Sequence, residues 1–360
     1  MIISADFWNK LKANKPAVAG MVIIVIAAFL SIFAYVIAPD NTPDANRMIV
    51  EIGGKKPGFQ QRFLKIPRAM NMESGSAVKE LFSGAADEYQ YLPIVDYRIT
   101  SDSIIVNKYI DENLTERQAY SKHMYKNGFS LQEHITEQQF LIGTDTYGRD
   151  ILSRLIIGIR VSMAVGIITV IISLTIGILL GALAGYFGGR TDSMIMWFIN
   201  IFWSIPTILL VFALTLLLGK GFWQVFIAIG LTMWVNVARM VRGQVMQVKQ
   251  LEYVEAARAL GYSNARIITR HILPNIMGPV MVIAASNFAS AIVIEAGLSF
   301  LGIGVQPPQP SWGLMIKENY NFIITQNAAL ALAPGVAIMI LVLAFNLLGN
   351  GLRDALDVKA

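Results

Sequence analysis

The sequence contains no cysteine and has little charge for its length. Without cysteine, disulfide bonds and thiolate metal sites are excluded for this chain of 360 residues. Its three histidines, His123, His134 and His271, are scattered with no metal-ligand spacing, so we expect no metal site. Charged residues make up 15% of the chain and hydrophobic residues 55%, whereas soluble domains carry about 25% charged residues. This balance indicates a membrane protein.

The sequence also lacks the motif G-x-x-x-x-G-K-[ST], with which ATPases hold phosphate. Residues 218–221 (LGKG) miss both the first glycine at the right offset and the hydroxyl residue. No Ser/His/Asp arrangement and no zinc-binding helix motif is visible, so we expect no catalytic residue, no bound cofactor and no enzymatic activity. The net charge of +5 forms no basic stripe, which argues against nucleic-acid binding. Any ATP-driven step would then belong to another chain.

Six apolar runs are long enough to cross a membrane: 17–38, 161–186, 194–218, 222–238, 276–301 and 328–348. Because backbone polar groups in lipid must be satisfied internally, these runs should be helices. The first run has a rival interpretation as a cleaved signal peptide. It is longer than the usual hydrophobic region of such a peptide, however, and no small-x-small cleavage site precedes Pro39. We predict an all-α polytopic membrane protein with six transmembrane helices.

The charge is concentrated in one block, since 29 of the 53 charged residues lie between Asp40 and Asp150. Within the block, patterns rich in Ile, Val and Tyr predict strands at 48–52, 94–100 and 103–110, and the last two favour a hairpin. Residues 115–126 are predicted to be helical. The chain thus divides into a first helix (1–39), a small α+β insertion (40–142) and a helical core (143–360).

Basic residues predict the orientation. The first sixteen residues hold three lysines, and the connection 239–275 holds six basic residues against two acidic ones. The competing short loops, 219–221 and 302–327, hold only Lys220 and Lys317 as basic residues. The positive-inside rule therefore places both termini and 239–275 in the cytoplasm. The long insertion lies outside, because long segments are translocated largely regardless of charge.

Two features within the spans have structural and functional interpretations. Gly177, Gly181 and Gly185 recur every four residues on one helix face, which favours close helix packing over mere tolerance of glycine. Ser204 and Pro206 interrupt the third span, and the missing N–H of proline predicts a kink. That kink is either a static bend or a hinge in a pathway.

Three further features are less specific. Glu295 is the only acidic residue in spans two to six, and it either takes part in a pathway or makes a structural hydrogen bond. Residues 143–160 alternate apolar and polar faces, as expected either of a helix in the membrane interface or of one packed on the preceding domain. Residues 302–313, rich in proline and glycine, should form a rigid outside loop.

The polar connection 252–276 (EYVEAARALGYSNARIITRHILPNI) predicts two short helices. Alanines favour a helix over 252–260, Gly261 stops it, and Ser263 caps the next helix, which runs towards Pro274. The first helix is either a plain connector or a docking element for a partner. The residues of that docking element would be Glu252, Tyr253, Glu255, Ala256, Ala257, Leu260 and Gly261.

This connection resembles the signature loop of permease subunits in binding-protein-dependent ABC importers. The shared pattern is EAA-x-x-x-G at 255–261, with Leu-Pro following at 273–274. His271 replaces the usual isoleucine, and HILPN is similar to the peptide and nickel branch of the family. Other stretches that resemble this branch are GTDTYGRDILSRL (143–155), LLGALAGYFGG (179–189), EAGLSFLGIGVQPPQPSWG (295–313) and AFNLLGNGLRDALD (344–357).

The resemblance implies the second of two dissimilar inner-membrane permeases, which forms half of a pathway for oligo- or dipeptides. It implies a homologous permease partner, two ATPase subunits that carry ATP and Mg²⁺, and an external substrate-binding protein. The helix 252–260 would be the coupling helix, and the last five spans would form the core. Nickel or another small solute is the alternative substrate. A self-sufficient secondary transporter is less well matched, because it would show more intramembrane charges or paired repeats.

Overall fold

The fold is taken from a computed structural model that describes residues 5–68, 76–125, 128–219, 221–324 and 327–356. Two compact units make up the chain. The first comprises Met1–Ala28, Ser162–Gln306 and Ile338–Ala360, and the second comprises Phe29–Val161 and Pro307–Ala337. Asp357, the last residue of the predicted carboxyl-terminal motif, lies outside the described residues.

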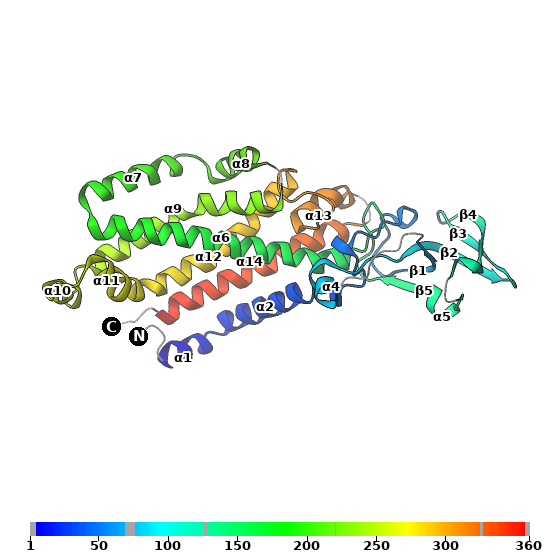
Figure 1. The fold of residues 1–360 in the computed structure, drawn as a ribbon, viewed down its shortest axis with the longest axis horizontal. Coiled ribbons are helices and arrows are strands. Elements are labelled where there is room, and N and C mark those ends of the chain that lie inside the picture. Colours follow the sequence, from blue (N-terminus) through cyan, green and yellow to red (C-terminus); the bar gives the residue numbers. More distant parts are fainter. Residues whose placement is uncertain (1–4, 69–75, 126–127, 220, 325–326, 357–360) are drawn as a thin grey trace. The chain divides into compact units, whose positions relative to one another are not determined.

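Membrane-length helices dominate the described residues (Figure 1). Five are long and apolar enough to cross a bilayer: α2 (Lys15–Ile32), α6 (Ile151–Phe187), α9 (Phe222–Val248), α12 (Leu273–Phe300) with the turns before it, and α14 (Ala329–Leu356). A sixth span is formed if α7 (Gly189–Trp203) and α8 (Thr207–Leu218) are taken together. The predicted helical membrane class is therefore confirmed.

Helices α6 and α9 extend beyond the predicted apolar runs 161–186 and 222–238. Residues 143–160 do not form a separate interface helix, because α6 begins at Ile151 and continues without a break for 37 residues. At 1.5 Å per residue it is about 55 Å long, well beyond the ~30 Å of a bilayer core. Helix α9 likewise runs to Val248, so helical structure covers 239–248 of the predicted connection 239–275.

The glycine stripe of α6 faces α9. A Cβ added to Gly181 would stand 2.5 Å from the carbonyl oxygen of Ala238, and one added to Gly185 would stand 2.7 Å from that of Arg242. A Cβ on Gly177 would collide with the Val237 side chain. The two backbones approach too closely for any side chain at these positions, as expected of a packing stripe.

The first described helix contacts the end of α14 within the first unit. Helix α1 (Ala5–Ala13) buries Phe7 and Leu11 in a cluster that also contains Ala17 and Ala355. The Asn14 amide donates to the Asp354 carboxylate at 3.1 Å.

The second unit contains a five-stranded antiparallel sheet in the order β4-β3-β2-β1-β5 (Figure 1). The strands are β1 (Phe59–Pro67), β2 (Tyr89–Ile99), β3 (Ser103–Tyr109), β4 (Thr115–Ser121) and β5 (Ile135–Phe140). The predicted hairpin is confirmed as β2–β3, with Ile99 opposite Ile104. Phe63 and Leu64 are both fully buried and lie in separate clusters, because neighbouring residues of a strand face opposite sides.

Two predictions in this region were wrong. Residues 115–125 do not form the predicted α-helix, because β4 pairs with β3 over its whole length and only Lys122–Met124 form a 3₁₀ turn; Lys126, the last residue of the predicted helix, lies outside the described residues. Cross-strand hydrogen bonds here override local helix preference. Residues 48–52 form no strand either: Val50–Ile52 is a 3₁₀ turn that buries Ile52 beside Phe63.

Short helices complete the second unit: α3 (Ala34–Ile37), α4 (Ala77–Ser83), α5 (Leu131–His134) and α13 (Trp312–Asn319). Two more 3₁₀ turns lie at Pro43–Ala45 and Tyr320–Ile323. Ser311 caps α13 by accepting a hydrogen bond from the Leu314 N–H at 3.1 Å.

Candidate functional site

The third span is broken, not kinked. Helix α7 ends at Trp203, α8 begins at Thr207, and the helix axes differ in direction by 89°. The Ser204 hydroxyl donates to the Ile201 carbonyl at 2.8 Å, and Pro206 precedes α8, where its missing N–H is tolerated. The sequence predicts a kink at Pro206, and the change of direction lies there, but the chain leaves helical geometry between Trp203 and Thr207 instead of bending a continuous helix.

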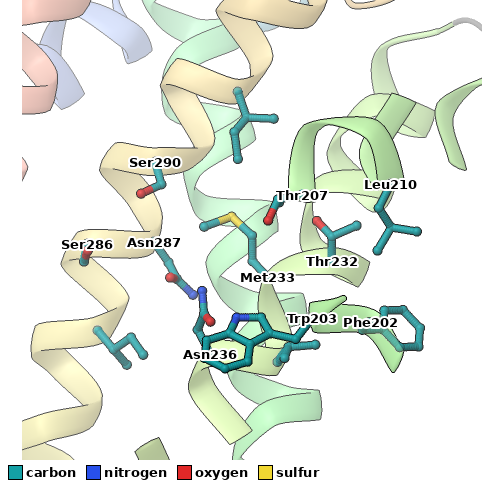
Figure 2. A pocket seen from close by; sticks show the side chains of 13 residues that line it. Phe202, Trp203, Thr207, Leu210, Thr232, Met233, Asn236, Ser286, Asn287 and Ser290 are labelled. Atoms are coloured by element: carbon teal, nitrogen blue, oxygen red, sulfur yellow. The ribbon is translucent and has the colours of Figure 1, made fainter. Parts of the chain in front are cut away.

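The break borders a cavity of about 340 Å³ in the first unit (Figure 2). Helices α8, α9 and α12 and the end of α7 supply its walls. Neutral polar groups gather there, and among the described residues that line the cavity none is charged. The lining residues are Phe202, Trp203, Thr207, Leu210, Thr232, Met233, Val235, Asn236, Ile283, Ser286, Asn287, Ser290 and Ile294.

Helical spacing explains why these side chains converge. On α12, Ile283, Ser286, Ser290 and Ile294 recur at intervals of three or four, which places them on one face, and Asn287 lies beside Ser286. Asn287 is anchored, because its amide donates to the Ser173 hydroxyl at 3.3 Å. Ser286 and Ser290 are exposed, as is Asn236 on α9, so they are open to a molecule in the cavity.

Arg239 holds one wall of the cavity in place. Its guanidinium lies 3.5 Å over the ring of Trp203, and its Nη2 donates to the Asn200 side chain at 3.0 Å. Such a cation–π contact fixes the ring in a defined position. Arg239 lies one turn beyond Asn236 along α9, in the direction of the polar connection. Sequence reasoning used Arg239 only for orientation and missed this contact.

Glu295 lies next to a cavity residue but is not among those that line it. Its side chain is fully buried and accepts a hydrogen bond from the Ser299 hydroxyl at 2.6 Å. That hydroxyl in turn accepts from the Val305 N–H at 3.0 Å. Of the two interpretations offered by the sequence, these contacts favour the structural hydrogen bond.

The polar connection folds as the sequence predicts. Helix α10 (Glu252–Ala259) is followed by Gly261 at φ +75°, where its N–H reaches the Arg258 carbonyl at 3.0 Å. A left-handed glycine is a common way to end a helix. Ser263 then caps α11 (Asn264–Ile267) by accepting from the Arg266 N–H at 3.4 Å. A π-helical turn, Ile268–Ile272, leads into α12.

Helix α10 has a buried and an exposed face. Val254 and Ala257 are buried in a cluster with Ile267 and Ile272, so Ala257, which the sequence analysis named as a docking residue, is not on the exposed face. The i, i+3 spacing of Val254 and Ala257 explains this, because both point to the same side of the helix. The other predicted docking residues are exposed: Glu252, Tyr253, Glu255, Ala256, Leu260 and Gly261.

Exposed apolar groups make the outer face of α10 suitable for a protein partner. The Leu260 side chain is 73% exposed and that of Tyr253 is 41% exposed. Partial burial raises the pKa of the Tyr253 phenol. An exposed leucine and tyrosine flanked by Glu252 and Glu255 form an apolar centre with acidic edges.

Side chains from α6 and α9 attach the polar connection to the spans. The Tyr186 hydroxyl donates to the Asn264 side chain at 2.8 Å, and the Lys249 ammonium donates to the Tyr186 carbonyl at 2.5 Å. Arg242 donates twice to the Asp192 carboxylate, at 2.5 and 2.6 Å. Sequence reasoning missed these contacts, since each joins residues about 50 or more positions apart.

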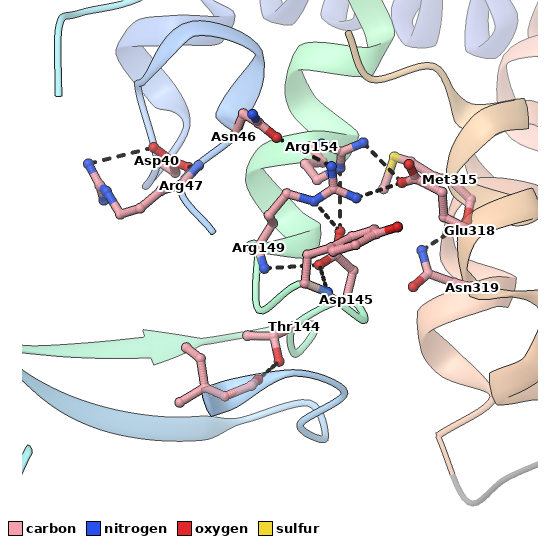
Figure 3. Close-up of polar contacts among 12 residues, drawn as sticks. Asp40, Asn46, Arg47, Thr144, Asp145, Arg149, Arg154, Met315, Glu318 and Asn319 are labelled. Carbon is pink, nitrogen blue, oxygen red and sulfur yellow. Dashed lines mark hydrogen bonds and ion pairs between the residues drawn. The ribbon is translucent and has the colours of Figure 1, made fainter. Parts of the chain in front are cut away.

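A second polar group, in the second unit, consists of paired charges (Figure 3). Arg149 donates to Asp145 at 2.6 Å and to Glu318 at 2.7 Å, and Arg154 donates to Glu318 at 3.3 Å. Asp145, Arg149 and Arg154 are almost fully buried, and Glu318 is 14% exposed. We call these four residues the ion cluster. Two positive and two negative charges balance, which is the condition for burying them.

The polar side chains at the start of α6 are buried and have hydrogen-bond partners within the protein. Ser153 donates from its hydroxyl to Asp150 and accepts from the Asp40 N–H at 2.8 Å. The Trp312 indole N–H donates to the Leu155 carbonyl at 3.0 Å. The polar side of 143–160 therefore packs against protein, including the segment from Asp40 onward, which favours the second of the two interpretations offered by the sequence.

Comparisons with known proteins agree with this picture. Residues 177–360 match the family described as binding-protein-dependent transport system inner membrane component, and residues 4–51 match the N-terminal transmembrane domain of oligopeptide transport permease C. The glutathione transport system permease protein GsiD of Pectobacterium atrosepticum is 42% identical over 61% of this chain and 72% of its own length.

Two relatives from Bacillus subtilis are similar to the same extent. The dipeptide transport system permease protein DppC is 40% identical over 64% of this chain and 73% of its own length. The oligopeptide transport system permease protein OppC is 42% identical over 60% of this chain and 71% of its own length.

Proposed function

This chain belongs to the family of inner membrane components of binding-protein-dependent transport systems, and we propose that it forms half of the translocation pathway of an ATP-driven peptide importer. In this proposal the other half is a second permease of similar fold. Two ATPase subunits dock on the cytoplasmic side, and a substrate-binding protein delivers the peptide from outside.

The exposed face of α10 is the observation that carries the proposal. The chain has no phosphate loop of its own, yet it presents Leu260 and Tyr253 on a short helix outside the spans. An ATPase groove that accepts this helix would move it when the ATPase dimer closes. Residues 40–142 are placed outside the cell and both termini inside, according to the basic residues.

The connections of α10 indicate how such movement would reach the pathway. Val254 and Ala257 share a buried cluster with residues of α6, α9 and α12. The Tyr186 hydroxyl joins the end of α6 to α11 through Asn264, and Lys249, just after α9, donates to the Tyr186 carbonyl. A displacement of α10 would therefore be passed to helices that line the cavity, and tilting α9 against α12 would change its width.

A peptide is the substrate that the lining of the cavity favours. Its described side chains are neutral, and they include serine, threonine and asparagine but no histidine or carboxylate. Nickel and similar cations bind through imidazole, carboxylate or sulfur ligands, and Met233 alone would be a poor site. The names of the relatives, which specify dipeptide, oligopeptide and glutathione transport, support the same choice.

Purification of the tagged chain from its native membrane tests the proposal. We expect two ATPase subunits and a second permease to co-purify in stoichiometric amounts. A variant with Leu260→Asp should lose the ATPases and keep the second permease, because it places a charge on the apolar docking face. Recovery of the chain alone, or ATPase binding that is unaffected by Leu260→Asp, would contradict the proposal.

A further inference from the structure

We propose that the cavity binds the main chain of the passing peptide through neutral side chains, chiefly Asn236, Ser286, Ser290 and Asn287. This inference rests on the proposed function and adds to it a substrate-contact site and a mode of recognition. The cavity would bind the main-chain N–H and C=O groups that all peptides have in common. Selection among peptide side chains would occur in other parts of the importer.

The chemistry of the lining matches a peptide backbone. Each peptide unit offers one N–H donor and one C=O acceptor. Serine hydroxyls and asparagine amides can donate and accept alike, so they can pair with either group. A peptide that left water for an apolar cavity without such partners would meet a large barrier, because unpaired amides are costly to bury.

The spacing of the groups fits an extended chain. Ser286 and Ser290 lie four residues apart on α12, a rise of about 6 Å. Thr232 and Asn236 have the same spacing on α9. Two residues of an extended peptide span about 6.6 Å, so backbone groups on one edge repeat at nearly the same interval. Two polar side chains on one wall can therefore contact every second peptide unit along the same edge of an extended peptide.

The neutral lining also suits a transport pathway, which must release the peptide that it binds. A charged group in the cavity would favour peptides of opposite charge and hold them tightly, whereas a pathway must bind weakly enough to release its cargo. Arg239 lies near this wall, but its guanidinium is engaged with Trp203 and Asn200. Figure 2 shows the serine and asparagine side chains gathered on the cavity walls.

A single introduced charge tests this assignment. Ser290→Asp should change the selectivity of ATP-driven uptake by the complete importer in proteoliposomes. We expect uptake of Ala-Glu-Ala to fall at least about tenfold relative to Ala-Lys-Ala, because a carboxylate in a confined site repels the acidic peptide. Ser193→Asp is the matched control, since Ser193 is an exposed serine of α7 outside the cavity lining. It should leave the ratio unchanged.

Labelling provides a second measurement that does not depend on the aspartate variant. Because the chain has no cysteine, Ser290→Cys introduces the only thiol on it. Maleimide modification of this chain, read by mass spectrometry, should slow at least about threefold when trialanine and its loaded binding protein are present with a non-hydrolysable ATP analogue. The thiol of Ser193→Cys should react at the same rate with and without peptide.

The outcomes separate the two proposals. If the native importer takes up no peptide, the proposed function fails and this inference fails with it. If the native importer takes up peptides, an unchanged Glu-to-Lys ratio in Ser290→Asp, or labelling of Ser290→Cys that peptide does not slow, overturns the inference alone.

Discussion

The cavity and the ion cluster are both polar regions of a largely apolar chain, but they treat their polar groups differently. In the ion cluster, buried charges are paired with one another, with Arg149 bridging Asp145 and Glu318. In the cavity the groups are neutral, and Ser286 and Ser290 are exposed. This comparison indicates that polar groups with hydrogen-bond or ion-pair partners in the chain stabilise its structure. Polar groups that face an open space are available to a ligand.

Breaking the ion cluster should have the largest effect on stability. Glu318→Gln removes one of two negative charges from two buried arginines, and loss of one partner of a buried pair costs about 3–5 kcal/mol. We expect a clear drop in the thermal midpoint of the detergent-solubilised importer. Glu112→Gln is the control, because Glu112 pairs with Lys55 while 80% exposed. Equal midpoints for the two variants would contradict a structural role for the cluster.

Placing a side chain between the closely packed helices α6 and α9 should have the next largest effect on stability. Gly181→Val places a side chain where the Ala238 carbonyl already lies, and overpacking of this kind costs about 1–3 kcal/mol. Gly243→Val is a matched control on α9, because nothing lies within 4 Å of its added Cβ. The difference in thermal midpoint between these variants measures the packing. If the Gly181 variant were as stable as the Gly243 variant, the glycines of α6 would not be needed for its close packing on α9.

Substitution at Gly261 should reduce stability less but abolish uptake. Gly261→Val forces a branched residue into left-handed backbone geometry, at a cost of about 1–2 kcal/mol, and it distorts the end of the docking helix. The variant should still insert, since Gly261 lies outside the spans. Gly58→Val shares the positive φ and the open surroundings but lies in the second unit. It should keep ATP-driven uptake, and loss of uptake in both variants would refute a specific coupling role.

Changes in the cavity should have the smallest effect on stability. Asn236→Leu alters an exposed side chain of similar size, and such changes usually stay within about 0.5 kcal/mol. Peptide uptake should nevertheless fall severalfold, because a donor and an acceptor are lost from the wall. A thermal midpoint that fell as far as in Glu318→Gln would place Asn236 among the structural groups instead.

Much of the fold follows from the sequence because its signals are local. Uninterrupted apolar runs predict the spans, and Ala256, Gly261 and Ser263 specify a helix, its end and the next cap. The same locality explains the errors. The helix predicted at 115–126 became strand β4 through pairing with β3, and the start of α6 became buried through Glu318, 164 residues away from Arg154.

The candidate site could be predicted only in part for the same reason. The docking residues lie within one short stretch, 252–261, so the sequence identifies them together, although it includes Ala257, which is buried. The cavity draws on residues as far apart as Phe202 and Ile294, and isolated serines or asparagines in apolar helices carry no distinguishing pattern. Only the packing of α8, α9 and α12 brings these residues together.

The most direct test of the proposed function is to measure which source of energy drives peptide uptake. Uptake of a neutral tripeptide should be measured in proteoliposomes that contain either this chain alone or this chain with its second permease, its ATPases and the binding protein. We expect uptake only with the full set of subunits and ATP. Uptake by the chain alone, driven by a proton or sodium gradient, would contradict the account.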